Sequence, residues 1–179
     1  MRALALIADR KLELADVPSP PPPAADEVQI RVKAVALNHL DLWGYRGMAF
    51  AKRKMPVVVG AEAAGEVAAV GSDAAPFKPG EPVVMYGAMT CGACRACREG
   101  RDNLCENVGG IMGFHIDGFA RDLVNMPARL VIPVPPGVAR TSLVVIALEL
   151  PGLKYELTGV VTVMTHGCLL IPTPIPGSA

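Results

Sequence analysis

The sequence has few aromatic residues, no excess of charge of either sign and no long hydrophobic run. Aromatic residues are only 4% of the chain, so Val, Ala, Leu and Ile must build most of any core. The 17 basic and 17 acidic side chains balance, which gives no reason to expect nucleic acid or an anionic membrane as a partner. The apolar run Leu143–Leu150 is far shorter than the ~20 residues that a membrane span needs. We therefore expect neither a nucleic-acid-binding nor a membrane protein.

A secretory signal and a dinucleotide-binding turn are also missing. The first residues include only a short apolar stretch before Asp9 and Arg10, which predicts a strand rather than a signal peptide, and hence a cytoplasmic location. Only 42 residues follow Gly137, and they contain no G-x-G-x-x-G turn after a strand. A dinucleotide-binding domain would need about 100–150 more residues. We expect no Rossmann domain, and residues 139–179 are predicted to be a divergent or truncated tail.

Glycine and proline are abundant, with 18 and 17 copies, and favour a turn-rich, mainly β architecture with short helices. Asn38 is the expected N-cap of a short helix. Many short strands separated by Gly and Pro predict a small closed barrel. The expected strands are Arg2–Ile7, Lys11–Ala15, Glu27–Leu37, Val57–Val59, Gly65–Val70, Pro82–Tyr86, Phe119–Met126 and Leu130–Val134.

Four of the five cysteines lie within fifteen residues, at Cys91, Cys94, Cys97 and Cys105. Two consecutive C-x-x-C steps and a nearby fourth thiolate suit a structural zinc ion, which takes four ligands in a tetrahedron. The alternative, two disulfides or free thiols, requires an oxidising compartment for the disulfides. Arg95, Arg98 and Arg101 are expected to offset the negative charge of the site. The spacing predicts one structural zinc per chain.

This cysteine pattern resembles the structural-zinc lobe of the medium-chain dehydrogenase/reductase family, the zinc-type alcohol dehydrogenases. Four flanking segments are similar to family motifs and occur in the same order: 56–67, 77–83, 117–120 and 130–138. The resemblance covers about residues 1–138. It implies a GroES-like β-barrel domain over those residues, with a projecting zinc lobe at 87–110. The family commonly has two glycines where only Gly118 precedes Phe119; a loss in the turn would preserve the strand register.

Enzymes of this family hold a second, catalytic zinc with a Cys, a His-Glu pair and a later Cys. By position, Asn38 replaces the first Cys and Ala61 the His, and only Glu62 is kept. An amide is a poor zinc ligand and alanine is none, so we expect no catalytic zinc.

The family position of the helix start makes three of its residues candidates for the active site. Asn38 is a candidate for both catalysis and cofactor binding, because its amide could donate to a substrate carbonyl, although it could equally serve only as the N-cap. Asp41 is the second catalytic candidate, or a first-turn acid favoured by the helix dipole. His39 could contact a cofactor phosphate, or be an exposed helix-start histidine.

The resemblance implies the catalytic-domain part of an oxidoreductase. In the full enzyme a hydride would pass between NAD(P)H and a carbonyl, quinone or activated alkene of a small molecule, and the family often forms homo-oligomers. NAD(P) binding is expected only where a cofactor domain is supplied, so this chain alone should be inactive. The alternative is a non-catalytic zinc-stabilised β-barrel module or enzyme fragment. A metal-handling or redox-sensing protein is a third hypothesis and would require labile zinc and reactive thiols.

Overall fold

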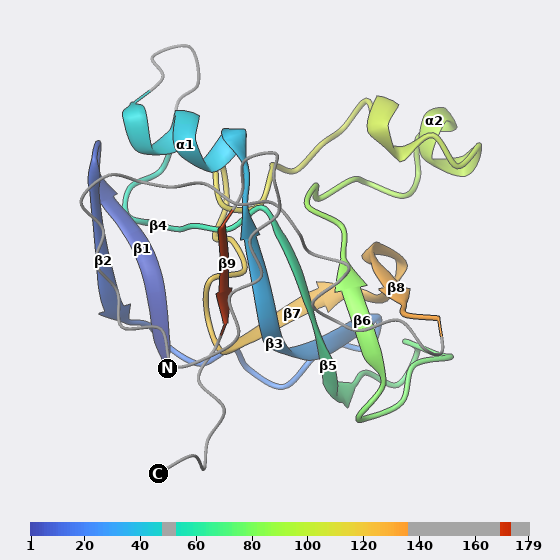
Figure 1. Ribbon diagram of the computed structural model, residues 1–179. Helices are drawn as coiled ribbons and strands as arrows, with labels where there is room; N and C mark the ends of the chain where they lie inside the picture. The colour runs from blue at the N-terminus through green and yellow to red at the C-terminus, as the bar shows by residue number, and fades with distance from the viewer. Residues whose placement is uncertain (48–52, 136–168, 173–179) are drawn as a thin grey trace, which may run out of the picture.

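A computed structural model describes residues 1–47, 53–135 and 169–172, which form mainly strands (Figure 1). Among these residues a three-stranded sheet has the order β2-β1-β4, and a six-stranded sheet has the order β7-β3-β5-β6-β8 with β9 also paired to β3. The strands are β1 (Arg2–Ala8), β2 (Lys11–Asp16), β3 (Glu27–Leu37), β4 (Val57–Val58), β5 (Glu62–Val70), β6 (Pro82–Met85), β7 (Leu123–Pro127), β8 (Val131–Pro133) and β9 (Leu169–Pro172). The helical elements are α1 (His39–Arg46), α2 (Arg95–Arg98) and the 3-10 turns η1 (Asp102–Leu104) and η2 (Ala128–Leu130). The mainly β fold class with short helices is confirmed.

Strand β3 is paired along both of its edges in the larger sheet and supplies much of the core. Its alternating sequence buries Val28, Ile30 and Val32, each at most 1% exposed. One edge of β3 pairs with β5, and the other pairs with β7 near its start and with β9 near its end. Opposite β3, a Cβ atom at Gly65 would lie only 2.4 Å from the carbonyl oxygen of Arg31, so the close pairing of β3 and β5 requires glycine there.

The two sheets do not close into one continuous barrel, which corrects the expected closed form. They meet around residues 118–121, where Leu4 N–H donates to the carbonyl of Ala120 and Ala120 N–H donates to that of Val59. A tight turn, in which Arg121 N–H bonds the carbonyl of Phe119, interrupts the extended chain at this point. Only an isolated bridge between Ala3 and Arg121 then pairs strand β1 with this segment.

The same turn explains why the strand predicted at Phe119–Met126 begins later in the structure than in the sequence-based prediction. Strand β7 begins at Leu123 rather than Phe119, and Leu130 belongs to η2 rather than to a strand. Val124 and Met126 are nevertheless buried, at most 1% exposed, so the alternating side chains still face the core. Gly118 lies before β7 and outside the strands, so a glycine lost beside it would leave the register of β7 unchanged.

Helix α1 begins with a capping box at Asn38. The Oδ1 atom of Asn38 accepts the N–H of Leu40 at 2.8 Å, and Oδ2 of Asp41 accepts the N–H of Asn38 at 2.9 Å. The helix ends at Gly47, whose φ of 76° is the left-handed conformation typical of helix C-termini. The predicted N-cap is therefore confirmed.

Asp41 also connects this helix, through a hydrogen bond, to the backbone between β4 and β5. Its Oδ1 atom accepts the N–H of Gly60 at 2.8 Å, and the residue is only 8% exposed. Burial raises the pKa of Asp41 from an ordinary 3.8 to about 6, although hydrogen bonds from Asn38 and Gly60 act in the opposite direction. The loss of hydration therefore outweighs the favourable hydrogen bonds to the carboxylate.

Of residues 139–179 the structure describes only β9, which pairs antiparallel with Ala34–Leu37 of β3; the rest of the predicted tail lies outside the described residues. Within the parts of the chain that are described, no helix is long and apolar enough to cross a membrane.

Asp41 makes a testable contribution to the pH dependence of stability. Because its folded pKa of about 6 exceeds the ordinary 3.8, the folded state binds this proton more tightly, and the contribution of Asp41 to stability falls as pH rises from about 4 to 6. In the variant Asp41→Asn this position cannot titrate. Urea unfolding from pH 3.5 to 7.5 should show the stability of the wild type relative to Asp41→Asn falling by on the order of 3 kcal/mol. Both proteins keep the cysteine cluster, so its own pH dependence cancels; a difference that is flat or rises with pH would contradict this account.

Candidate functional site

The four cysteines lie in a lobe, residues 87–110, that projects away from the two sheets (Figure 1). Its two ends are joined where they leave the sheet: Met89 N–H donates to the carbonyl of Gly110 at 2.9 Å, and Met112 N–H donates to that of Gly87 at 2.9 Å. This metal lobe contains α2 and η1, in which only Ala96 is buried. Its fold therefore has little hydrophobic core of its own.

The sulfur atoms of Cys91, Cys94, Cys97 and Cys105 all lie within 4.8 Å of one another. All four are free thiols, and the Sγ atoms of Cys91 and Cys105 are 3.6 Å apart while those of Cys91 and Cys97 are 4.0 Å apart. Four thiolates at about 2.3 Å from a tetrahedral ion would be about 3.8 Å from each other. The cluster therefore has the composition and the spacing to hold one metal ion.

Backbone N–H groups of the first turn point at the sulfur of Cys91. Those of Ala93 and Cys94 lie 3.4 and 3.3 Å from it and lower the pKa of Cys91 to about 6. Burial, together with Cys94 and Cys105, raises the pKa of Cys97 to about 12. Four thiolates this close repel one another, so complete ionisation of the cluster requires a bound cation.

The arginines near the cluster do not all have the role expected from the sequence. Arg95 pairs with Glu99 at 2.7 Å and its side chain is 84% exposed, and Arg101 also pairs with Glu99. These two charges are therefore shared with a carboxylate. Sequence reasoning missed Arg129, which comes from η2 and packs on the cluster's first turn: a Cβ atom at Gly92 would lie 2.9 Å from its Nε atom. No local signal marks Arg129, because 24 or more residues separate it from every cysteine of the cluster.

A groove of about 430 Å³ lies beside the start of α1. Its lining includes the positions that, by the family resemblance, correspond to ligands of a catalytic zinc. We call it the Asn38 groove. Asn38, Ala61 and Glu62 line it together, so the fold brings these sequence-predicted positions side by side. The remaining lining is largely apolar: Leu40, Ala63, Val84, Met85, Tyr86, Gly87, Ala88, Ile111 and Ile132.

The other two candidates do not line the Asn38 groove. His39 is exposed on the first turn of α1, with its ring 6.4 Å from that of Trp43. Asp41 uses both carboxylate oxygens on backbone N–H groups, as described above. Within the described residues, the four-cysteine cluster is the one group of three or more His, Cys, Asp or Glu that could hold a metal.

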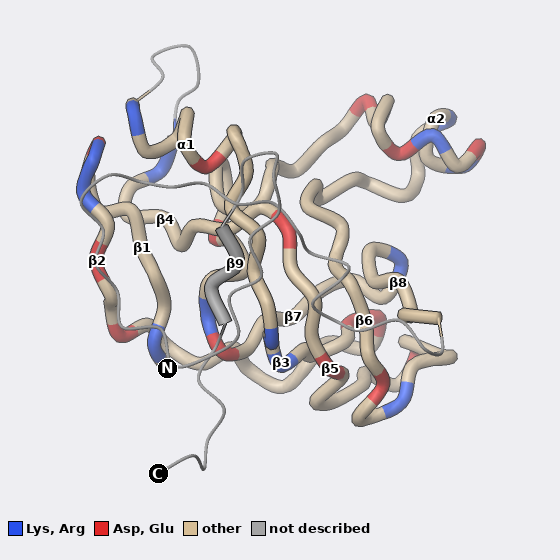
Figure 2. Tube along the Cα trace, viewed as in Figure 1, with Lys and Arg blue, Asp and Glu red and all other residues tan. Residues whose placement is uncertain are grey.

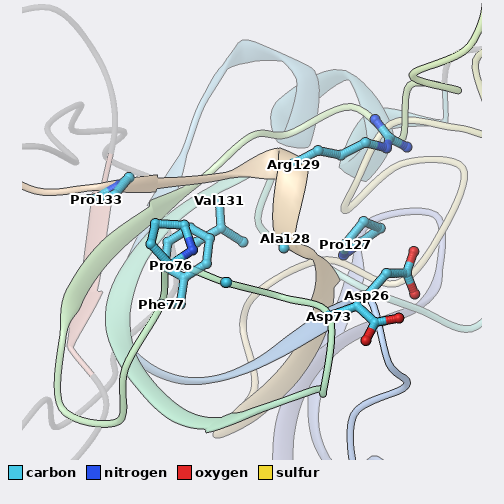
Figure 3. A pocket seen from close by; sticks show the side chains of 10 residues that line it. Asp26, Asp73, Pro76, Phe77, Pro127, Ala128, Arg129, Val131 and Pro133 are labelled. Carbon is cyan, nitrogen blue, oxygen red and sulfur yellow. The ribbon is translucent and has the colours of Figure 1, made fainter.

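A second cavity, of about 540 Å³, lies between the Pro76–Phe77 segment and the chain from Pro127 to Pro133 (Figure 3). Asp26 and Asp73 stand at one end of it, and no residue predicted from the sequence to act in catalysis or cofactor binding lines it. Arg129 contributes to the wall, but Figure 3 shows its guanidinium directed away from Pro76 and Phe77.

Comparison with known proteins identifies the group to which this domain belongs. Residues 24–136 match the model of the alcohol dehydrogenase GroES-like domain. The chain is 35% identical over 137 residues to a sorbitol dehydrogenase of Bacillus subtilis (strain 168), and 36% identical over 134 residues to an L-threonine 3-dehydrogenase of Rhizobium etli (strain CIAT 652). The matched regions are 75% and 74% of this chain but only 38% of each relative.

Solved structures agree with these relatives. An NAD-dependent alcohol dehydrogenase superposes with a TM-score of 0.70 at 40% identity, over 78% of this chain and 41% of that structure. The alcohol dehydrogenase of the archaeon Aeropyrum pernix gives a TM-score of 0.72 at 31% identity, over 80% of this chain and 42% of the structure. The chain thus spans about two fifths of the length of the relatives it matches, and it belongs to the alcohol dehydrogenase GroES-like domain family of the zinc-type dehydrogenases.

Proposed function

We propose that this chain is the zinc-stabilised catalytic-domain part of an NAD(P)-dependent oxidoreductase, with one structural zinc bound by Cys91, Cys94, Cys97 and Cys105. The proposed metal site is supported by the positions of the four sulfur atoms, which all lie within 4.8 Å of one another. Zinc suits them because it accepts four thiolates in a tetrahedron and has no redox chemistry. Bound there, zinc would supply the positive charge that lets all four thiols ionise.

The oxidoreductase activity is proposed for the longer enzyme. The matched relatives are named as sorbitol, L-threonine and alcohol dehydrogenases, and one matched structure is named as NAD-dependent. By this likeness, NAD(P) and a small-molecule substrate would bind to a longer enzyme that also contains a cofactor domain. In this chain the proposed GroES-like domain comprises residues 1–138, including the metal lobe at 87–110, and the tail comprises residues 139–179. Homo-oligomer formation and a cytoplasmic location belong to the same proposal.

The Asn38 groove is the proposed place of the substrate. Since Oδ1 of Asn38 accepts the N–H of Leu40, the amide NH2 group remains as a donor. Such a donor can stabilise the negative charge that develops on a carbonyl oxygen as a hydride is added to its carbon. Asn38 can thus cap α1 and donate a hydrogen bond to the substrate at the same time. His39 would contact the cofactor, and Asp41 would hold the backbone of the site in place. We propose no catalytic zinc in the groove, because Asn38 and Ala61 stand where the ligands would be.

A non-catalytic zinc-stabilised module remains the alternative. In that case the four-cysteine cluster would stabilise the fold without any catalytic role. The two hypotheses differ in whether a nicotinamide cofactor binds.

Loss of one ligand should release the metal and melt the lobe. We expect Cys94→Ser to bind no zinc at micromolar free metal and to lose thermal stability, because the lobe has almost no buried apolar residue to replace the metal. Metal analysis and a thermal melt make the measurement. Cys168→Ser is the matched control: it makes the same chemical change at the fifth cysteine, which lies outside the described residues, and should keep one zinc. Unchanged zinc content and melting in Cys94→Ser would refute the site.

Native mass spectrometry of the full chain should detect one zinc per chain and no second metal. Repeating the measurement with NADPH separates the two hypotheses. We expect no saturable nucleotide binding by this chain alone, since residues that could form a dinucleotide turn are missing from the sequence. Two zinc ions per chain would contradict the proposal that Asn38 and Ala61 exclude a catalytic zinc. Bound NADPH would contradict the expectation that the cofactor site lies on a separate domain.

A further inference from the structure

Three side chains outside the ligand set form a chain of hydrogen bonds beside the cysteine cluster. We call Arg129, Thr90 and Asp102 the Arg129 relay. The Nη1 atom of Arg129 lies 3.0 Å from Oγ1 of Thr90, and the same hydroxyl lies 3.0 Å from Oδ1 of Asp102. The Nη2 atom of Arg129 also donates to the backbone carbonyl of Thr90. Thr90 is only 2% exposed, so its hydroxyl is largely shielded from water although Arg129 is exposed.

The chemistry of the three groups fixes the direction of each bond. A guanidinium can only donate, so the Thr90 hydroxyl accepts from Arg129. That hydroxyl has one proton, which it can then donate to the carboxylate of Asp102. The relay thus joins a cation to an anion through one buried hydroxyl, and such charge-assisted bonds are stronger than neutral ones.

The relay connects the two ends of the ligand loop. Thr90 immediately precedes the first ligand, Cys91. Asp102 begins η1, and its carbonyl accepts the N–H of Cys105, the last ligand. The bond from Thr90 to Asp102 therefore closes the loop at the point where its first and last sulfurs lie 3.6 Å apart.

Arg129 attaches this closed loop to the body of the protein. It belongs to η2, which connects β7 with β8 in the larger sheet, and its stem packs against Gly92 between the first two ligands. Figure 3 shows its head directed away from the neighbouring cavity. Gly92 has a φ of 68° and leaves no room for a side chain there, so the first turn of the cluster and Arg129 fit each other closely.

We propose that Arg129 is a positioning residue which, through Thr90 and Asp102, holds the four-cysteine cluster closed and slows the release of its metal. This proposal rests on the metal site proposed above and goes beyond it, since none of the three residues is a ligand. Opening the loop must break the Thr90–Asp102 bond, and moving the lobe off the sheet must break the bonds of Arg129. Outer groups that orient metal ligands typically contribute 10–100-fold to metal affinity.

The test compares zinc release from the full 179-residue chain and its variants into excess chelator. Thr90→Val keeps the shape of the side chain but removes the hydroxyl, and should speed zinc release by about 10–100-fold. Thr90→Ser keeps the hydroxyl and should release zinc at nearly the wild-type rate. The Co²⁺-loaded proteins add a spectroscopic readout: the ligand-field bands of Thr90→Val should broaden or shift, and those of Thr90→Ser should match the wild type.

Arg129→Gln is a second variant that avoids the buried position, since Arg129 lies at the surface. It should also speed zinc release by about tenfold or more. Arg95→Gln is its matched control, because it removes the same charge from an 84% exposed side chain outside the relay, and it should release zinc like the wild type.

Three results would overturn the proposal: wild-type release rates in both Thr90→Val and Arg129→Gln, equal acceleration in Thr90→Ser and Thr90→Val, or equal acceleration in Arg95→Gln and Arg129→Gln. The second would indicate a packing effect and the third a general charge effect. A wild-type chain that binds no zinc would instead refute the metal site itself, so the two failures are distinguishable.

Discussion

The repulsion among four closely placed thiolates is the constraint on which the metal lobe depends. The lobe has two short helical elements with Ala96 as their one buried residue, so burial of apolar surface cannot hold it together. Hydrogen bonds at its neck and the Arg129 relay bring the sulfurs near one another, but they do not remove the cost of ionising all four. A bound cation would remove that cost, and the free energy of metal binding would then contribute to the folding of the lobe.

The Asn38 groove lies outside the metal lobe's cysteine cluster and depends on a different contact. Asp41 joins the start of α1 to Gly60 with a buried carboxylate, and this contact sets where Asn38 and Glu62 meet. The position that the family resemblance assigns to a metal ligand holds Asn38 in this chain, and the Asn38 side chain makes a hydrogen bond to the helix backbone. The proposed structural metal and the proposed chemistry of the groove would therefore be separable. The metal would stabilise a lobe, whereas the chemistry would depend on the two-sheet scaffold and on a domain that supplies the cofactor.

Sequence reasoning was most successful where spacing along the chain determines the result. The alternation of β3, the cap at Asn38 and the clustering of Cys91–Cys105 are local patterns, and the structure agrees with each. Contacts between distant segments were not predictable. The turn at Phe119–Arg121, after which β7 begins, is held by hydrogen bonds to β1 and to the residues directly after β4. The approach of Arg129 to Gly92 depends on how η2 leaves the sheet. The ion pairs of the lobe were likewise not predicted: Arg95 and Arg101, two of the three arginines expected to offset the charge of the cluster, both pair with Glu99.

The most direct test of the central claim is X-ray absorption spectroscopy at the zinc edge of the purified chain. The account predicts a first shell of four sulfurs at about 2.3 Å with no nitrogen or oxygen ligand. That result would place all four cysteines on one closed site. A shell containing nitrogen, oxygen or fewer than four sulfurs, in protein that carries stoichiometric zinc, would show that the metal is bound elsewhere or that the lobe does not close, and would contradict the account.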